Sequence, residues 1–348
     1  MKRPRHVPGT RAAARRPPRT PTADFEPEFR THSLQVPSES AGLRLDQALA
    51  QLLPQYSRAR LQEWIQAGAV QVDGRRLRGK DRLLGGEQVW IEARIEPERV
   101  LEPESIPLDV IFRDRALLVV NKPAGLVVHP GAGNAHHTLQ NALLAIDAKL
   151  ALVPRAGIVH RLDKDTSGLL VVARTPEAHT ALVSALSERE IERQYIAICT
   201  GVMTGGGTID EPIGRHRTQR TRMAVRGDGR PAITHYRVLE RFRAHTLVRV
   251  QLESGRTHQI RVHLAHIGYP LVGDPMYGGR RRIPAGSSAG LLAHLNAFKR
   301  QALHAARLAL THPVSGREMS WEAPLPADMA RLCEAMELDR AAAGGRLQ

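Results

Sequence analysis

The stretch Gly157–Val172 reads GIVHRLDKDTSGLLVV, and its pattern decides what kind of fold surrounds it. Both ends of the stretch are apolar and typical of short buried strands, whereas His160–Gly168 between them is polar. The stretch therefore predicts a polar loop held between two strands. A rigid scaffold that presents a polar loop is a common architecture for a reactive site, and Asp163 is the candidate reactive side chain.

Two plainer interpretations compete for the carboxylates of this loop. Asp163 or Asp165 could stabilise the turn through hydrogen bonds to the backbone, which is the usual role of an aspartate in a loop. The pair also falls at the first and third positions of a calcium-binding loop, but the twelfth position carries Arg174 instead of a bidentate glutamate. A predicted strand fills much of that interval, so we exclude calcium binding.

A second informative stretch is Glu253–His263, which reads ESGRTHQIRVH. Its glycine turn leads into a predicted helix that runs to His266 and places Arg256 and Arg261 near its first turns. The histidines of this helix suggest zinc, but no glutamate stands in an HExxH arrangement and no third ligand is evident. The sequence therefore predicts no metal site.

The composition of the whole chain indicates a basic protein with room for two domains. The chain has 348 residues, of which 42% are hydrophobic, and a net charge of +15. Such an excess attracts polyanions, nucleic acid first and an anionic membrane surface second, although it could merely aid solubility. Most basic residues are arginines, which suits RNA because arginine binds phosphate and stacks on bases; a GC-rich genome gives the same bias.

The cysteines and the apolar runs indicate a protein of the cytoplasm. Cys199 and Cys333 are far apart and outside any CxxC spacing, which argues against a disulfide framework and a thiolate zinc site. No apolar run approaches the roughly 20 residues that a membrane span requires. Residues 1–22 are basic and proline-rich without an apolar core, so they do not resemble a secretory signal.

The chain divides into five predicted segments. Residues 1–35 are predicted to be a disordered basic tail, because their arginine and proline content prevents a packed core. We assign 43–96 to a small separate module, 97–107 to a linker, 108–335 to the main domain and 336–348 to a C-terminal tail. Strand patterns with few helices at irregular spacing dominate the main domain, which predicts an α+β fold with a mainly antiparallel sheet.

Besides the elements already named, the main domain shows further strand patterns, of which six are examples, and one long helix. The strands come from short apolar or alternating runs, and the helix from a Thr-Pro start followed by inward-facing apolar residues. The expected strands are Leu117–Asn121, Leu126–His129, Gly168–Arg174, Gln194–Cys199, Ile233–Leu239 and Leu247–Leu252, and the helix is Pro176–Arg189.

The small module carries a helix starting near Arg44, a second helix around Trp64, and a hairpin turn at Asp73-Gly74 before a strand at Gln88–Ile91. Charges on a small module usually lie on a solvated face. Their number within one short stretch favours a phosphate-binding face, for which the candidates are Arg58, Arg60, Arg75, Arg76, Arg78 and Lys80. The pattern resembles the S4 RNA-binding domain.

Three segments resemble the RluA family of pseudouridine synthases. Arg155–Gly168 is similar to the family signature, Gly255–Arg261 to its later motif, and Arg193–Tyr195 to the position of its active-site tyrosine. The strings Val128–Asn134 and Leu271–Gly279 narrow the resemblance to members that modify 23S ribosomal RNA in the loop of helix 69. The resemblance covers about residues 43–335 and implies a catalytic domain behind an S4-like domain.

The resemblance implies a role for each residue of the site. Asp163 would be the catalytic nucleophile, Arg261 would keep it ionised and oriented, and Tyr195 would stack on the uracil and help to remove its C5 proton. A packing role is the alternative for Tyr195, and a structural role in the loop is the alternative for the arginine that would fill the space left by the flipped base. Four residues would bind the substrate: Arg161, Ile260, Arg256 and His160. Arg161 is the arginine that would fill the space left by the base, and His160 more readily shapes the loop.

The resemblance also implies the partners. The substrate would be 23S ribosomal RNA or the precursor of the large ribosomal subunit, and the enzyme would need no cofactor, bind no membrane and act as a monomer. Pseudouridine formation is an isomerisation, which agrees with the absence of a Walker loop and of a GxGxxG fingerprint. A sister synthase for another rRNA site or tRNA, a non-catalytic ribosome-assembly protein and a metal-dependent hydrolase are the alternatives.

Overall fold

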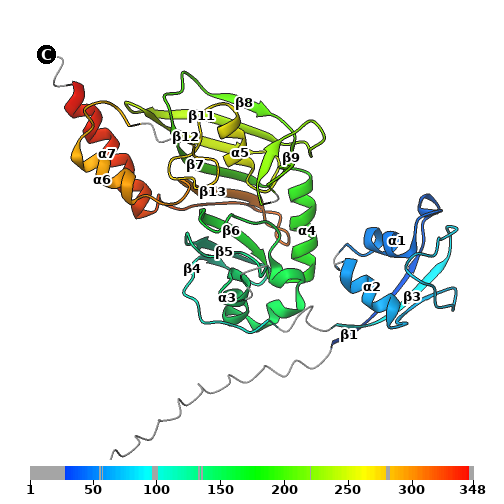
Figure 1. Cartoon of the computed structure of the whole chain (residues 1–348). Coiled ribbons are helices and arrows are strands. Elements are labelled where there is room, and N and C mark those ends of the chain that lie inside the picture. Colours follow the sequence, from blue (N-terminus) through cyan, green and yellow to red (C-terminus); the bar gives the residue numbers. More distant parts are fainter. Residues whose placement is uncertain are drawn as a thin grey trace, which may run out of the picture.

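A computed structural model shows two bodies side by side, a small one in blue and cyan and a larger one that runs from green to red (Figure 1). The small body precedes the large one in the sequence, in the order that the sequence predicts. The structure describes residues 28–95 apart from 55 and 57, and residues 101–344 apart from 132, 133, 135, 220 and 280–282.

The small domain consists of one antiparallel sheet, in the order β1-β3-β2, and two helices packed on it. Apolar residues that recur along the helices meet alternating apolar residues of the strands in one core, where Leu49, Leu61 and Ile91 are 0% exposed. The elements are β1 (Glu28–Gln35), a 3-10 turn (Ser38–Ser40), α1 (Leu45–Leu52), α2 (Arg58–Gln66), β2 (Val70–Val72) and β3 (Gln88–Ile95).

Strand β1 corrects the predicted N-terminal tail. Residues 28–35 read EFRTHSLQ and pair with β3 along their whole length, so the prediction of a disordered tail is wrong for this segment. An edge strand buries only one face, and the few apolar residues that it needs do not stand out in a single sequence. The rest of the predicted tail, residues 1–27, lies outside the described residues.

The main domain is built on a sheet of nine strands within the described residues, in the order β4-β5-β6-β13-β7-β12-β11-β8 with β14 beside β13. Its pairings are antiparallel except for β6 with β13. The predicted α+β class with a mainly antiparallel sheet is therefore confirmed. The strands are β4 (Asp109–Arg113), β5 (Leu117–Lys122), β6 (Ser167–Ala173), β7 (Glu192–Thr200), β8 (Gly207–Asp210), β11 (Ile233–Arg241), β12 (His245–Leu252), β13 (Leu303–Thr311) and β14 (Glu318–Glu322).

Two cores lie on opposite faces of this sheet. Along β5, Leu118 and Val120 belong to the core that includes α3 and α5, whereas Leu117 and Val119 belong to the core under α4, because successive side chains of a strand point to opposite faces. The helices are α3 (Leu139–Ile146), α4 (Pro176–Ser187), α5 (Gln259–His266), α6 (Ala289–Ala297) and α7 (Ala327–Gly344), with 3-10 turns at Ala148–Leu152 and Pro154–Gly157 and a separate hairpin of β9 (Ile213–Arg215) and β10 (Met223–Val225).

Three further expectations are wrong, and one of them is the strand before the reactive loop, where Pro154–Gly157 is a 3-10 turn and Ile158 forms only an isolated bridge. Residues 336–344 belong to α7, which packs against α6 at the end of the main domain farthest from the small domain (Figure 1), and buried Met336 anchors them, so the predicted C-terminal tail is helical up to Gly344. Leu126–His129 is not a strand, since after the turn at Gly125 it forms only an isolated bridge. None of the helices in the described ranges is both long and apolar enough to cross a membrane.

Candidate active site

The loop that carries Asp163 lies at the start of β6, in the middle of the sheet, and two cations from distant segments hold its backbone. The ammonium of Lys122, which is 0% exposed, donates to the carbonyl of Lys164 at 3.0 Å. Arg300 donates from Nη1 to the carbonyl of Asp165 at 3.2 Å. The two carbonyls that follow Asp163 are therefore fixed, which limits how far its carboxylate can move.

Burial lowers the pKa of Lys122 to about 7, although the charges of Asp165 and Asp163 act in the opposite direction. Its ammonium also donates to the carbonyls of Pro123 at 2.8 Å and Leu126 at 3.0 Å. Three carbonyl acceptors satisfy its three donors, so Lys122 ties the turn after β5 to the reactive loop.

Arg261 joins two carboxylates into one chain of ion pairs. Its Nη1 donates to Asp163 Oδ2 at 3.0 Å, and its Nε and Nη2 donate to the two oxygens of Asp274 at 2.7 and 2.8 Å. The Asp274 side chain is 0% exposed and that of Asp163 is 16% exposed. Arg261 is thus held by the deeper carboxylate and presents one edge of its guanidinium to the carboxylate at the surface.

The surroundings of Asp274 and Arg261 in this series of ion pairs favour the charged form of each side chain. Burial alone would raise the pKa of Asp274, but its hydrogen bonds and charge pairing with Arg261, and the amides of Tyr277 and Met276, hold that pKa below its ordinary value. Burial would lower the pKa of Arg261, and the two carboxylates outweigh this effect and raise it. Asp274 was not among the residues expected in the site, because an aspartate in a loop next to a proline looks like an ordinary turn residue.

Helix α5 presents Arg261 because its first turn is locked to the sheet. Gln259, which is buried, accepts from the amide of Arg256 at 3.0 Å and donates to the carbonyl of Ile233 at 3.0 Å. Ile260 is 4% exposed and lies in the core between α5 and the sheet, and its role as an apolar wall beside the base stays a prediction. The side chain of Arg256 instead donates to the carbonyl of Pro231 at 3.2 Å, so the structure gives it a contact outside the ion-pair chain.

Tyr195 lies on β7 and is 6% exposed. It stands opposite Val250 of β12 and Ala305 of β13, in the centre of the sheet. Burial raises the pKa of Tyr195, and the charge of Asp163 adds to this while that of Arg193 opposes it, so the phenol stays neutral at physiological pH. The hydroxyl of Tyr195 therefore lies close enough to Asp163 for the charge of this carboxylate to affect its pKa.

A histidine and a second tyrosine complete the surroundings of Asp163, and the sequence did not single them out as site residues. His258 Nδ1 lies 2.9 Å from the hydroxyl of Tyr277, and its Nε2 lies 3.9 Å from Asp163 Oδ1. The guanidinium of Arg261 stands 5.1 Å from the centre of the Tyr277 ring. Both residues fall within the quoted motifs, but only the three-dimensional contact shows that they share a site.

The remaining loop residues differ in exposure. His160 accepts from the amide of Val171 at 3.1 Å, and its burial, with the charge of Arg193, lowers its pKa to about 3. It is therefore a neutral support of the loop, as the sequence favours. Arg161 is exposed beside the reactive loop. The structure thus brings Asp163 and Arg261 into direct contact and leaves Arg161 facing solvent.

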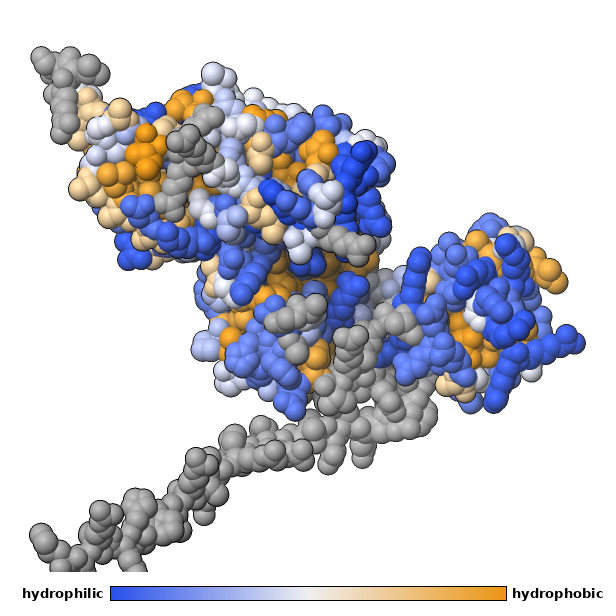
Figure 2. Space-filling view, in the orientation of Figure 1, coloured by the Kyte–Doolittle hydropathy of each residue, from blue (hydrophilic) through white to orange (hydrophobic). Residues whose placement is uncertain are grey.

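The basic residues expected on the small domain do not all lie on its surface. Five of them are exposed, namely Arg58, Arg75, Arg76, Arg78 and Lys80. Hydrophilic residues cover much of the visible face of this domain (Figure 2). Arg60 is only 7% exposed and lines a pocket between the two domains, so it does not belong to the exposed group. Its position on α2, one turn before buried Trp64, explains why it points inward.

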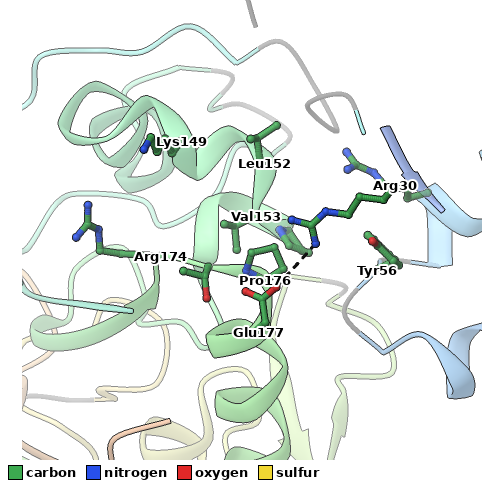
Figure 3. Close-up of a pocket in the computed structure, with 11 residues that line it drawn as sticks. Arg30, Tyr56, Lys149, Leu152, Val153, Arg174, Pro176 and Glu177 are labelled. Carbon is green, nitrogen blue, oxygen red and sulfur yellow. Dashed lines mark ion pairs between the residues drawn. The ribbon is translucent and has the colours of Figure 1, made fainter. Parts of the chain in front are cut away.

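That pocket has a volume of about 220 Å³ and lies between β1 and α2 of the small domain and the start of α4 of the main domain (Figure 3). Arg30 reaches across it and its Nη1 lies 3.8 Å from Glu177 Oε1. On the opposite wall, Arg174 is paired with Asp147 at 2.6 Å. The pocket therefore marks where the domains meet, not the reactive loop.

Within the described ranges, no three His, Cys, Asp or Glu residues are grouped so that they could hold a metal ion.

The sequence of this chain matches two protein families and is similar to known enzymes. The RNA pseudouridylate synthase family matches residues 116–266, and the S4 domain family matches residues 43–89. Ribosomal large subunit pseudouridine synthase D of Escherichia coli strain K12 is 57% identical over 305 residues, 87% of this chain and 94% of that protein. The enzyme of the same name from Xanthomonas campestris is 55% identical over 308 residues, 88% of this chain and 93% of that protein.

Two solved structures resemble this chain in fold and in sequence. Human RNA Pseudouridylate Synthase Domain Containing 4 is 27% identical with a TM-score of 0.52, and the match covers 66% of this chain and 93% of that one. Human RNA Pseudouridylate Synthase Domain Containing 1 is 27% identical with a TM-score of 0.50, covering 68% and 97%. The narrower resemblance to synthase D and the S4-like module are confirmed. The chain therefore belongs to the RluA family of pseudouridine synthases and is an RNA pseudouridine synthase.

Proposed function

We propose that this enzyme converts uridines of 23S ribosomal RNA, in the loop of helix 69, to pseudouridine, in the cytoplasm, as a monomer and without a cofactor. The observation that carries the proposal is the ion pair of Asp163 with Arg261, 3.0 Å apart in the middle of the sheet. The choice of ribosomal RNA rests on relatives that are named large-subunit pseudouridine synthases. The strings Val128–Asn134 and Leu271–Gly279 support the same target region.

The reaction is an internal rearrangement. The N1–C1′ bond breaks, the uracil turns, C5 bonds to C1′, and the proton of C5 is lost while N1 gains one. No group leaves the nucleotide. Asp163 is the nucleophile that helps to expel the uracil from C1′, as carboxylates do at the sugar carbon in glycosidases, either by bonding to C1′ or by promoting elimination.

Arg261 orients this nucleophile. The guanidinium is fixed by Asp274 through two hydrogen bonds of 2.7 and 2.8 Å, and only its Nη1 is left for Asp163. Oδ2 of Asp163 is thus occupied by Arg261, and Oδ1, which lies 3.9 Å from His258 Nε2, faces the sugar. Such pre-positioning lowers the entropic cost of reaching the transition state.

Tyr195 acts on the base. Its ring supplies an apolar surface on which a uracil stacks, and its hydroxyl assists the removal of the C5 proton. The raised pKa of Tyr195 keeps this hydroxyl protonated, so it relays a proton in place of acting as a standing anion.

The target base must leave its stack before it reaches Asp163, at a cost of a few kcal/mol. Arg161 is exposed beside the nucleophile and occupies the space that the base leaves. The exposed basic residues of the small domain contact phosphates, which supply affinity without reading sequence.

The test is to map pseudouridines in the ribosomal and transfer RNAs of a strain that lacks the gene. Sites in the helix 69 loop should lose the modification, wild-type protein should restore it, and Asp163→Asn should not. Loss of sites elsewhere in rRNA, or in tRNA, would replace the proposed target with that of a sister synthase.

A further inference from the structure

Arg193 is a buried cation that the proposed mechanism leaves without a task. It lies on β7 two residues before Tyr195, so both side chains project from the same face of the strand. The residue is 7% exposed, and its Nε has no hydrogen-bond partner. Within the described part of the chain, its guanidinium forms no ion pair with a carboxylate.

An unpaired buried cation is unfavourable for folding. Buried charges in proteins are normally paired and hydrogen-bonded, because desolvation of an uncompensated charge costs several kcal/mol. Folds keep such features mainly at functional sites, where a ligand supplies the missing partner. The missing partner of Arg193 is therefore expected to be an acceptor or an anion that arrives with the substrate.

The surroundings place Arg193 between the two motifs that build the site. On one side, a Cβ added to Gly255 would lie 3.0 Å from Arg193 Nη1, so the glycine lets the start of the Gly255–Arg261 segment approach the guanidinium closely. On the other side, the charge of Arg193 lowers the pKa of His160 in the reactive loop. The same charge acts on the hydroxyl of Tyr195. Arg193 therefore adjoins the place where the uracil is proposed to stack.

His160 offers a second unused donor in the same region. The amide of Val171 donates to His160 Nε2, so the neutral ring must carry its proton on Nδ1. That Nδ1 is buried and has no partner either. Two buried N–H donors near Tyr195 thus lack an acceptor, and water or a carbonyl oxygen of a base would satisfy them.

We propose that Arg193 binds a carbonyl oxygen of the target uracil and stabilises the uracil anion that forms when the N1–C1′ bond breaks. This inference rests on the proposed function. The electron pair of the broken bond stays on N1 and is delocalised onto O2 and O4, so a donor on either oxygen stabilises the developing charge. The guanidinium keeps its proton throughout. The negative charge leaves the uracil ring when its electron pair forms the C5–C1′ bond, and the proton of C5 is then lost while N1 gains one.

The experiment compares Arg193→Gln and Arg193→Lys with the wild type, using single-turnover conversion of a saturating rRNA hairpin, binding affinity for that hairpin, and the melting temperature of the free protein. Arg193→Gln should be about 100-fold slower, the usual effect of losing one donor to a developing anion. Affinity should change little, and Arg193→Lys should recover part of the rate. The melting temperature should stay the same or rise, because an uncompensated buried charge has been removed.

The matched control is Arg307→Gln on neighbouring β13, where the arginine is a third exposed and pairs with Glu192 at 3.0 Å. Its rate should equal that of the wild type. A second arm places 2-thiouridine or 4-thiouridine at the target, since sulfur is a weak acceptor. One of the two should slow the wild type more than Arg193→Gln, which identifies the oxygen that Arg193 contacts.

Several results would overturn the inference. A wild-type rate for Arg193→Gln, or a melting temperature lowered by several degrees with no other change, makes the residue structural. A loss of affinity at unchanged rate makes it a phosphate contact. Failure of the wild type itself on every rRNA hairpin refutes the proposed function instead, and the melting temperatures still report whether Arg193 is an unneutralised charge.

Discussion

Asp274→Asn is the substitution that tests most directly whether the ion-pair chain organises the site. The carboxylate of Asp274 accepts from Nε and Nη2 of Arg261 at 2.7 and 2.8 Å, and from the amides of Met276 and Tyr277 at 2.8 and 3.0 Å. Asparagine has nearly the same volume but no charge, and it replaces one acceptor oxygen with an NH₂ group. That group would face an N–H of Arg261, so one contact becomes a clash of two donors.

The magnitude follows from burial. Removing one partner of a buried ion pair costs about 3–5 kcal/mol. Arg261 keeps Asp163 as a partner, so we expect the lower end of that range, about 3 kcal/mol, in the free energy of unfolding. For a domain of roughly 150–250 residues this corresponds to a melting temperature lower by about 6–12 °C. The rate should also fall by about 100-fold, because Arg261 no longer fixes the position of the nucleophile.

The assay combines thermal unfolding with single-turnover kinetics at a temperature where all variants are folded. Asp228→Asn is the matched control, since Asp228 also accepts two hydrogen bonds from one arginine, Arg226, but its side chain is 68% exposed. Solvent screens an exposed pair such as this one, so this variant should behave like the wild type. Wild-type melting temperature and rate in Asp274→Asn would refute the view that Asp274 holds Arg261 in place.

The effect of Asp274→Asn on the free energy of unfolding should depend on pH. The folded-state pKa of Asp274 lies below its ordinary value, so its contribution to stability is present above the ordinary carboxyl pKa and is lost as the pH falls through the folded value. The difference in unfolding free energy between wild type and Asp274→Asn should therefore shrink in acid. A difference that stays constant between pH 7 and about 3 would show that the lost charge is not its cause.

Four other outcomes are expected. Asp163→Asn should abolish isomerisation and leave RNA affinity nearly intact, and substantial turnover by the purified variant would remove Asp163 from the chemistry. Tyr195→Phe keeps the ring but loses the hydroxyl, so single-turnover conversion should slow by about 100-fold at unchanged affinity; a wild-type rate would reduce Tyr195 to packing. Removing residues 1–96 should give RNA binding a shallower salt dependence, because phosphate contacts are lost, and an unchanged slope would mean that the small domain does not touch the RNA. The pKa of Lys122 is about 7 in the folded protein and 10.5 ordinarily, so the unfolded chain binds more protons between these two values. The free energy of unfolding of the wild type, measured with urea, should therefore rise with pH across this window. Lys122→Met should abolish this rise.

Local patterns were sufficient for some parts of this molecule. The apolar ends of Gly157–Val172 and its polar centre predict a loop between strands, and the structure confirms the loop and the strand β6 that follows it. The strand expected before the loop is absent, because Pro154–Gly157 is a 3-10 turn and Ile158 forms only an isolated bridge. The contact of Asp163 with Arg261 joins residues 98 positions apart, and it was reached only through resemblance to a family. Spacing along the chain carries no information about such a contact, because the folding of the sheet decides it.

Other parts could not be predicted, for physical reasons. Arg58 and Arg60 are the same residue type on one helix, but Arg60 lies one turn before buried Trp64 and lines the pocket between the domains, whereas Arg58 is exposed. Lys122 follows a buried strand and looks like a surface lysine at its end, yet three carbonyls that converge from two segments make a buried site for it. In both cases tertiary contacts override what the residue type favours.

The single parallel pairing of the sheet determines how deep Asp163 lies. β6 and β13 pair at only two positions before they diverge, and the amide of Val171 beyond that point is satisfied by His160 instead of a strand. Gly168 makes this close pairing possible, because its φ is +117° and a Cβ there would lie 2.3 Å from the carbonyl oxygen of Ala305. Any larger residue would push β6 away from β13 and carry the loop with it. The glycine of the motif therefore serves the position of the nucleophile, although it contributes nothing to the chemistry itself.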